Sequence, residues 1–280
     1  MVNLQMSEIY LRHITNLLLL NGSLTECPGL IHGKMGIIIF FFHYARYTGN
    51  MLFEDYAIDL IEEMQTQIHS NSSANYERGI AGIGVGMDYL FKNNLLEADD
   101  GIFDDFDKRM YRAVMYDPWQ NFSLYEGLTG YGRYWMFRLP VAKQASECLL
   151  RIVEYIEEKT IIISDKEQID VFCFLQDLKK KSSFSKKIKL LEKCQIPADN
   201  SYSFPRFENS PIGNIMQMYQ HFRYINSDIQ GSIYTELNKI MNTEIGKFPV
   251  SMGLLNGNAG EGMMRLTALT PMNITWIDLM

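Results

Sequence analysis

The sequence predicts an all-α protein, an α/α toroid of about six helical hairpins that forms a single domain over residues 1–280. Three observations predict this fold. Pairs of glycines three residues apart recur at a nearly constant spacing, a helix-length apolar segment follows each pair, and an amphipathic segment comes next. Each repeat is therefore expected to be a hairpin with a buried inner helix and a half-exposed outer helix.

The glycine pairs set the length of the repeat. Four complete pairs occur, and a weaker fifth copy keeps only its second glycine. The five copies are Gly33/Gly36, Gly79/Gly82, Gly127/Gly130, Ser210/Gly213 and Gly257/Gly260. The intervals between their first members are 46, 48, 83 and 47 residues, so the third interval is nearly two repeats long. We therefore expect one more repeat, with a decayed marker, between about Pro140 and Pro205.

The segments that follow the glycine pairs are apolar on nearly every side. They are residues 37–42, 83–87, 131–139 and 263–269. A helix that is apolar all round belongs inside a protein. An open solenoid leaves one edge of each helix exposed, whereas two concentric rings bury the inner helices completely. The pattern therefore favours a closed toroid whose inner helices begin at the glycine pairs.

The outer helices are predicted from a different periodicity. In residues 53–68 apolar side chains recur every three or four positions, with carboxylates on the opposite face. Gly49 is expected to end the preceding inner helix. Residues 161–163 could form a short strand, but Ser164 to Glu167 resembles a capping box. We therefore expect a helix over residues 167–178.

Composition excludes several classes of protein. With 47% apolar and 21% charged residues the chain is neither disordered nor fibrous, and its net charge of −7 disfavours a binder of nucleic acid. No apolar run approaches the ~20 residues that cross a bilayer, and the first residues do not resemble a signal peptide. Four widely spaced cysteines favour reduced thiols. We expect a cytoplasmic protein that has no membrane span.

A ring of polar residues is the candidate site, because the residue before each first glycine is polar. These residues are His32, Arg78, Glu126, Asn209 and Asn256, and Tyr125 and Tyr131 would add aromatic walls. In a toroid they would surround one mouth, where helix dipoles and unpaired N–H groups favour anionic or strongly polar ligands. The alternative is that they only cap the helices, which Asn does well but Arg and His do poorly. His32 and Glu126 are the candidates for catalysis.

Four segments carry a resemblance to a known family. Residues 29–37, 78–84, 125–132 and 253–260 resemble the repeats of lanthionine synthetase C-like proteins, and the resemblance covers nearly the whole chain. It implies an α/α toroid, usually of seven hairpins, that closes thioether rings on dehydrated peptides. It also implies a zinc ion, held by two cysteines and one histidine, that turns the substrate thiol into a thiolate.

This chain departs from the zinc motif of the family. The family histidine lies in a Cys-His-Gly sequence of a late repeat, whereas here the late repeats carry Asn209 and Asn256. The one His-Gly sequence is in the first repeat, at His32. We therefore expect no metal and no cofactor. An unusual zinc site stays open, with ligands drawn from Cys27, His32, His43, Cys173 and Cys194.

The main hypothesis is a zinc-free member of this family that binds a peptide or assists its modification. Its partner would be the peptide substrate or a modification enzyme. One alternative is a glycoside-active toroid that uses Glu126 and Glu261 as paired carboxylates. Another is a structural subunit whose surface, rich in Tyr and Met, packs on another chain. The sequence leaves open whether the protein is an enzyme.

Overall fold

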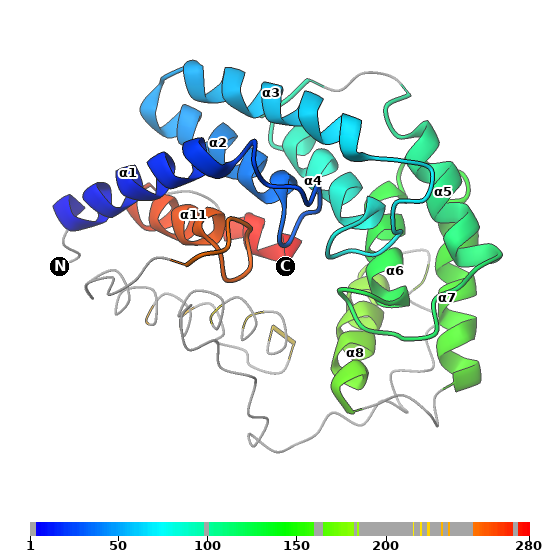
Figure 1. The fold of residues 1–280 in the computed structure, drawn as a ribbon. Helices are drawn as coiled ribbons and strands as arrows, with labels where there is room; N and C mark the ends of the chain where they lie inside the picture. Colours follow the sequence, from blue (N-terminus) through cyan, green and yellow to red (C-terminus); the bar gives the residue numbers. More distant parts are fainter. Residues whose placement is uncertain are drawn as a thin grey trace. The chain divides into compact units, whose positions relative to one another are not determined.

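The structure is a computed structural model, and the regular elements that it describes are all helical (Figure 1). It describes residues 4–97, 101–159, 165–181, 249–270 and 274–280, together with isolated positions between 184 and 235. Within these residues there is no strand, so the all-α prediction is confirmed. None of the described helices is long and apolar enough to cross a membrane.

The helices follow one another as the repeats require. In chain order they are α1 (Leu4–Asn21), α2 (Lys34–Thr48), α3 (Leu52–Gln67), α4 (Ile80–Lys92), α5 (Asp104–Met115), α6 (Leu128–Arg138), α7 (Ala145–Lys159), α8 (Asp165–Lys179), α11 (Asn258–Leu269) and the 3₁₀ helix η2 (Ile274–Leu279). The helices α2, α4, α6 and α11 each begin directly after the first glycine of a pair. The glycine pairs therefore mark the starts of the inner helices, as predicted.

Contacts divide the chain into two compact units. The first unit comprises residues 1–72, 89–97 and 204–280, and the second comprises residues 73–88 and 98–203. The helix α4 has residues in both units. The single domain over residues 1–280 stays a prediction.

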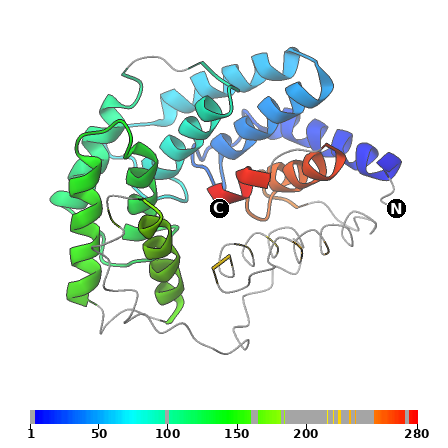
Figure 2. The ribbon, with the colours of Figure 1, turned by 180° about the vertical axis from the view of Figure 1, so that it is seen from behind.

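In the first unit, α2 and α3 form the hairpin that the sequence predicts (Figures 1 and 2). Every residue of α2 from Lys34 to Ala45 is buried, as an inner helix should be. Gly49 has a φ of 68° and its N–H donates to the carbonyl of Ala45, which ends the helix in the left-handed conformation that glycine adopts without cost. The outer helix α3 buries Ala57, Leu60, Ile61 and Met64 and exposes the carboxylates of Asp55, Asp59 and Glu62.

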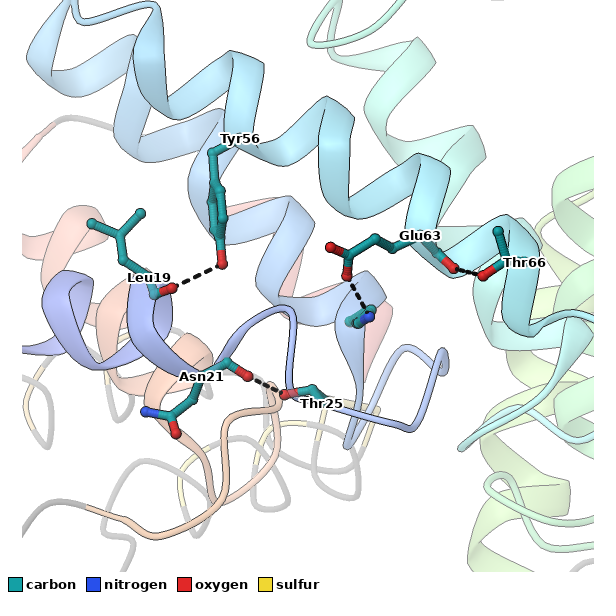
Figure 3. A network of polar contacts seen from close by, with 7 residues as sticks. Leu19, Asn21, Thr25, Tyr56, Glu63 and Thr66 are labelled. Carbon is teal, nitrogen blue, oxygen red and sulfur yellow. Dashed lines mark hydrogen bonds and ion pairs between the residues drawn. The ribbon is translucent and has the colours of Figure 1, made fainter.

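Polar contacts fasten this hairpin and join it to α1 (Figure 3). The buried Lys34 ammonium donates to Glu63 Oε2 over 2.7 Å. The Tyr56 hydroxyl donates to the carbonyl of Leu19 on α1 over 3.0 Å. The first contact joins the inner helix to its outer partner, and the second joins that outer helix to α1.

The helix α11 packs against both α1 and α2. The guanidinium of Arg265 on α11 lies 5.0 Å from the centre of the Tyr10 ring on α1. Behind α11, η2 is tied down by the Trp276 indole N–H, which donates to Thr267 Oγ1 over 2.9 Å. Thus α1 is the outer partner of the inner helix α11, although the two helices are far apart in the sequence.

In the second unit, α6 packs against α7 and α8. Near the end of α6 the Asp107 carboxylate of α5 accepts hydrogen bonds from the Tyr134 hydroxyl at 2.5 Å and from Arg138 Nη2 at 2.9 Å. Asp107 thus joins α5 to α6.

Neighbouring inner helices touch in a fixed register. In two of the marked repeats a further glycine, five residues after the first glycine of the pair, faces an aromatic ring. That ring lies seven residues after the first glycine of the neighbouring repeat. In the second unit Gly84 faces Tyr134, and in the first unit Gly262 faces Phe40. A Cβ atom at either glycine would overlap the ring, so these positions allow the close approach of the helices.

The same register identifies the repeat whose marker has decayed. Gly132 lies five residues after Gly127 and faces Phe174 on α8. Phe174 should then lie seven residues after the missing first glycine, which places that position at Glu167 and the second glycine position at Asp170. The helix α8 is therefore the inner helix of the unmarked repeat, and its two glycines are replaced by carboxylates. It includes the helix expected over residues 167–178, whereas Ser164 and residues 161–163 lie outside the described residues.

Candidate functional site

The loops before the inner helices share one backbone conformation. In each of four repeats the N–H of the first helical residue donates to a carbonyl seven residues earlier. The pairs are Lys34 to Cys27 at 2.8 Å, Ile80 to Ser73 at 2.9 Å, Leu128 to Asn121 at 3.0 Å and Asn258 to Ser251 at 2.9 Å. Each loop thus folds back and caps its own helix with a backbone carbonyl.

This loop geometry corrects the expectation of unpaired N–H groups at the mouth. The second N–H group is also taken in α2, α4 and α11, where Met35, Ala81 and Ala259 again donate to loop carbonyls over 3.1–3.3 Å. The same bonds disfavour the alternative that the polar residues serve only as helix caps, because the loop carbonyls already cap these helices. A ligand at any of these loops would therefore meet side chains rather than free N–H groups.

In the first unit, two of these loops are joined by backbone hydrogen bonds. The carbonyl of Ile31 accepts from the N–H of Leu254 at 2.9 Å and from the N–H of Leu255 at 3.2 Å. His32 and Asn256 follow directly in the chain. The junction thus places two of the predicted site residues on adjoining loops.

In the second unit, the equivalent loops are joined in the same register. The carbonyl of Tyr125 accepts from the N–H of Tyr76 at 3.0 Å and from the N–H of Glu77 at 2.9 Å. Arg78 and Glu126 are the next residues on these two loops. In both units the accepting carbonyl lies two residues before the first glycine of its own repeat. The two donating N–H groups lie three and two residues before the first glycine of the other repeat. The first and last marked repeats are therefore neighbours, joined as the two repeats of the second unit are.

The site residues of the first unit are partly buried. His32 is half-buried. Asn256 has a φ of 58°, a left-handed conformation that Asn tolerates better than most residues. Its Oδ1 atom is buried and receives no hydrogen bond from the residues that the structure describes. Asn256 thus holds a buried hydrogen-bond acceptor that none of the described residues uses.

The site residues of the second unit are more accessible. The Arg78 side chain is 65% exposed, and its Nε lies 3.5 Å from the Glu77 carboxylate. Glu126 is exposed as well, and its backbone N–H donates to Ser123 Oγ over 3.4 Å. This unit thus presents a cation and an anion to solvent on two joined loops.

The two tyrosines differ in how much surface they offer. Tyr125 is half-buried, and burial, followed by the charge of Asp170, raises the pKa of its phenol. Tyr131 is only 4% exposed, and burial, followed by Asp117, raises its pKa to about 12. Both phenols stay protonated at neutral pH, and Tyr131 leaves little ring surface for a ligand. Asn209 lies outside the described residues.

A comparison with known families places the chain. The family model described as lanthionine synthetase C-like protein matches residues 26–183, which is more than half of the sequence. The chain belongs to the lanthionine synthetase C-like family. The matched residues include three glycine pairs and α8, so the resemblance seen in the glycine-pair segments is confirmed. A search of curated proteins and one of solved structures found no match.

The described residues of this lanthionine synthetase C-like protein do not fit the zinc site of the family. Asn256 stands before the glycine where the family pattern has histidine, and Leu255 stands where it has cysteine. Within the described ranges no three His, Cys, Asp or Glu side chains gather as a metal site requires. Cys148 is buried, and burial raises its thiol pKa to about 12, which disfavours a thiolate. Cys194 lies outside the described residues.

His43, one of the alternative zinc ligands, has a partner within the core. Its Nε2 lies 2.8 Å from the Tyr89 hydroxyl, within the first unit. Burial, together with the charge of Arg46, lowers the pKa of His43 to about 4. His43 is therefore a neutral, hydrogen-bonded core residue at physiological pH.

Glu261 is a buried carboxyl on α11, in the first unit, whereas Glu126 belongs to the second. Glu261 is 6% exposed, and burial raises the pKa of its carboxyl to about 7, although the nearby Arg265 opposes this shift. Sequence reasoning singled out Glu261 but missed Arg265. The signal was available, because a Glu and an Arg four residues apart on a helix lie on one face.

Proposed function

We propose that this lanthionine synthetase C-like protein binds a peptide at the loops before its inner helices and assists the modification of that peptide in the cytoplasm. One observation carries the proposal. Loop carbonyls cap the inner helices, so the polar side chains before the glycines are not needed for capping. In each unit two different polar groups stand at equivalent positions, and each pair suits a ligand that carries both donors and acceptors. The pairs are His32 and Asn256 in the first unit and Arg78 and Glu126 in the second.

The exposed pair in the second unit matches the chemistry of a peptide. Arg78 can donate to a carboxylate or to main-chain carbonyls through its fork of N–H groups. Glu126 can accept from an ammonium or from main-chain N–H groups. Because Tyr125 joins the two loops through its carbonyl, Arg78 and Glu126 are held in one register. A peptide segment with mixed charges is therefore the class of ligand that we propose.

We also propose that the protein works without a resident zinc ion. The support is the pair Leu255 and Asn256, which provides neither a thiolate nor an imidazole in the late repeat. The expected role is then to hold a peptide for a modification enzyme, with His32 and Glu126 as the candidates for any acid–base step. Elemental analysis of the purified protein tests this point, and stoichiometric zinc would contradict it.

Peptide binding can be measured directly by fluorescence anisotropy. The probes are labelled synthetic peptides that contain cysteine together with serine or dehydroalanine. We expect Arg78→Ala and Glu126→Ala to weaken binding with little loss of thermal stability, since both side chains are exposed. Arg112→Ala is the matched control, because Arg112 is an exposed arginine of the same unit outside these loops. Equal peptide affinities for all three variants and the wild type would exclude the loops that carry Arg78 and Glu126 as the binding site.

The glycosidase alternative has one observation in its favour. A carboxyl with a pKa of about 7, as Glu261 has, is suited to act as a general acid at neutral pH. If the wild type turns over a glycan and Glu126→Gln abolishes this activity, the result would favour a glycosidase over a peptide-binding protein.

The structural-subunit alternative depends on exposed apolar surface. Tyr116 and Trp119 are 76% and 56% exposed, in the stretch between α5 and α6. Light scattering tests it, because a stable assembly would favour a subunit.

A further inference from the structure

Two carboxylates on α8 replace the backbone contacts that the other junctions use. Backbone hydrogen bonds join the loops at Ile31 in the first unit and at Tyr125 in the second. At both junctions the N–H group three residues before the first glycine of one repeat donates to a loop carbonyl of the neighbouring repeat. Leu124 holds this position before Gly127. Its N–H donates to the Asp170 carboxylate, Oδ2, over 2.9 Å. A side chain of the repeat without glycines therefore takes the place of a carbonyl.

Glu167 provides a second contact to the same loop. Its Oε1 atom accepts from the N–H of Phe122 over 2.8 Å. Glu167 and Asp170 stand at the two positions where the register of the inner helices would place glycines. They lie three residues apart on α8 and so share one face of the helix. Bonds from N–H groups to carboxylates are charge-assisted and stronger than bonds between neutral groups.

The loop held by these carboxylates is the one that carries the candidate site of the second unit. Residues 121–126 include Tyr125 and Glu126. On one side the Tyr125 carbonyl accepts from the loop that carries Arg78, and on the other side α8 accepts from Phe122 and Leu124. The loop is therefore clamped between a backbone junction and a pair of side chains.

We infer that Glu167 and Asp170 are positioning residues, which hold the loop 121–126 in the conformation that presents Tyr125 and Glu126. The inference rests on the proposed function only for what this loop binds. Each carboxylate accepts from the backbone N–H group of a different loop residue, so its removal should release that group in particular.

Amide hydrogen exchange followed by NMR tests the assignment residue by residue. In Asp170→Ala we expect the amide of Leu124 to exchange about ten- to a hundredfold faster, as the loss of a bond to a charged group predicts. In Glu167→Ala the amide of Phe122 should accelerate instead. Asp170→Asn keeps an acceptor oxygen and should restore part of the protection of Leu124. Gln176→Ala is the matched control, because Gln176 is a half-buried polar residue on the same helix.

The outcomes separate this inference from global destabilisation and from the proposed function. Unchanged amides in both alanine variants would overturn the inference, and so would a uniform acceleration that includes α7. Released amides together with weaker binding of the labelled peptides would support it, whereas released amides with unchanged affinity would overturn the positioning role. If the wild type binds none of the peptides, the proposed function fails, and the exchange rates still decide whether the carboxylates hold the loop.

Discussion

Protonation of Glu261 should make the stability of the protein depend on pH in an unusual direction. Its carboxyl is buried on α11, and the pKa rises from the ordinary 4.5 to about 7 because burial disfavours the charged form. The folded state therefore holds this proton more tightly than the unfolded state. The contribution of Glu261 to stability is complete below the unfolded pKa and is lost as the pH rises through the folded pKa.

The size of the effect follows from the difference between the two pKa values. A difference of about 2.5 pKa units corresponds to about 3 kcal/mol in the free energy of unfolding. Most of this loss should fall between about pH 4.5 and about pH 7, since that is the interval between the two values. The charged group that opposes the shift is Arg265, which Tyr10 of α1 contacts, while α2 places the apolar ring of Phe40 against this helix at Gly262.

Urea unfolding, followed by circular dichroism at a series of pH values, measures this contribution in wild type and in Glu261→Gln. The variant cannot titrate at this position. Between acid and neutral pH its free energy of unfolding should therefore fall by about 3 kcal/mol less than that of the wild type. The difference between the two pH profiles is the relevant quantity, because the variant also leaves Arg265 without its carboxylate at every pH. Glu62→Gln, at an exposed glutamate of the same unit, is the control. Parallel profiles for wild type and Glu261→Gln would refute the reasoning.

Three further predictions concern packing and chemical reactivity. Gly262→Ala should cost about 1 to 3 kcal/mol in thermal unfolding, because the new Cβ would overlap the ring of Phe40. Glu63→Ala should cost about 1 to 2 kcal/mol in urea unfolding, because it strands the buried ammonium of Lys34, and adding Lys34→Met should recover most of the loss. Cys148 should resist alkylation by iodoacetamide in the folded protein and react in urea, as mass spectrometry will show, because burial raises its pKa to about 12.

The starts of the inner helices could be predicted because they depend on local sequence. The helices α2, α4, α6 and α11 each begin directly after the first glycine of a pair, and the spacing of these pairs is visible in one chain. The apolar segment that follows is long enough to identify a buried helix. The end of α2 at Gly49 was predictable for the same reason, since a left-handed cap favours glycine. These features need no knowledge of which repeat lies beside which.

The contacts between repeats could not be predicted, because they depend on register. Glu167 and Asp170 look like ordinary acidic residues at a helix start, and only the packing of Phe174 on Gly132 shows that they replace a glycine pair. The polar residues before the glycines were identified from sequence. That the loops cap their own helices was missed, because the acceptors are backbone carbonyls, which any residue type provides.

The pairing of α1 with α11 bears on how the chain is made. The face of α1 that carries Leu11, Ile14 and Leu18 is buried in the folded protein, yet its partner α11 lies far along the sequence. In a nascent chain that emerges from the ribosome, this apolar face would therefore stay exposed to solvent until α11 has been synthesised. Chaperones that bind exposed apolar segments should have α1 as an early target, and shortening the chain before α11 should prolong their association.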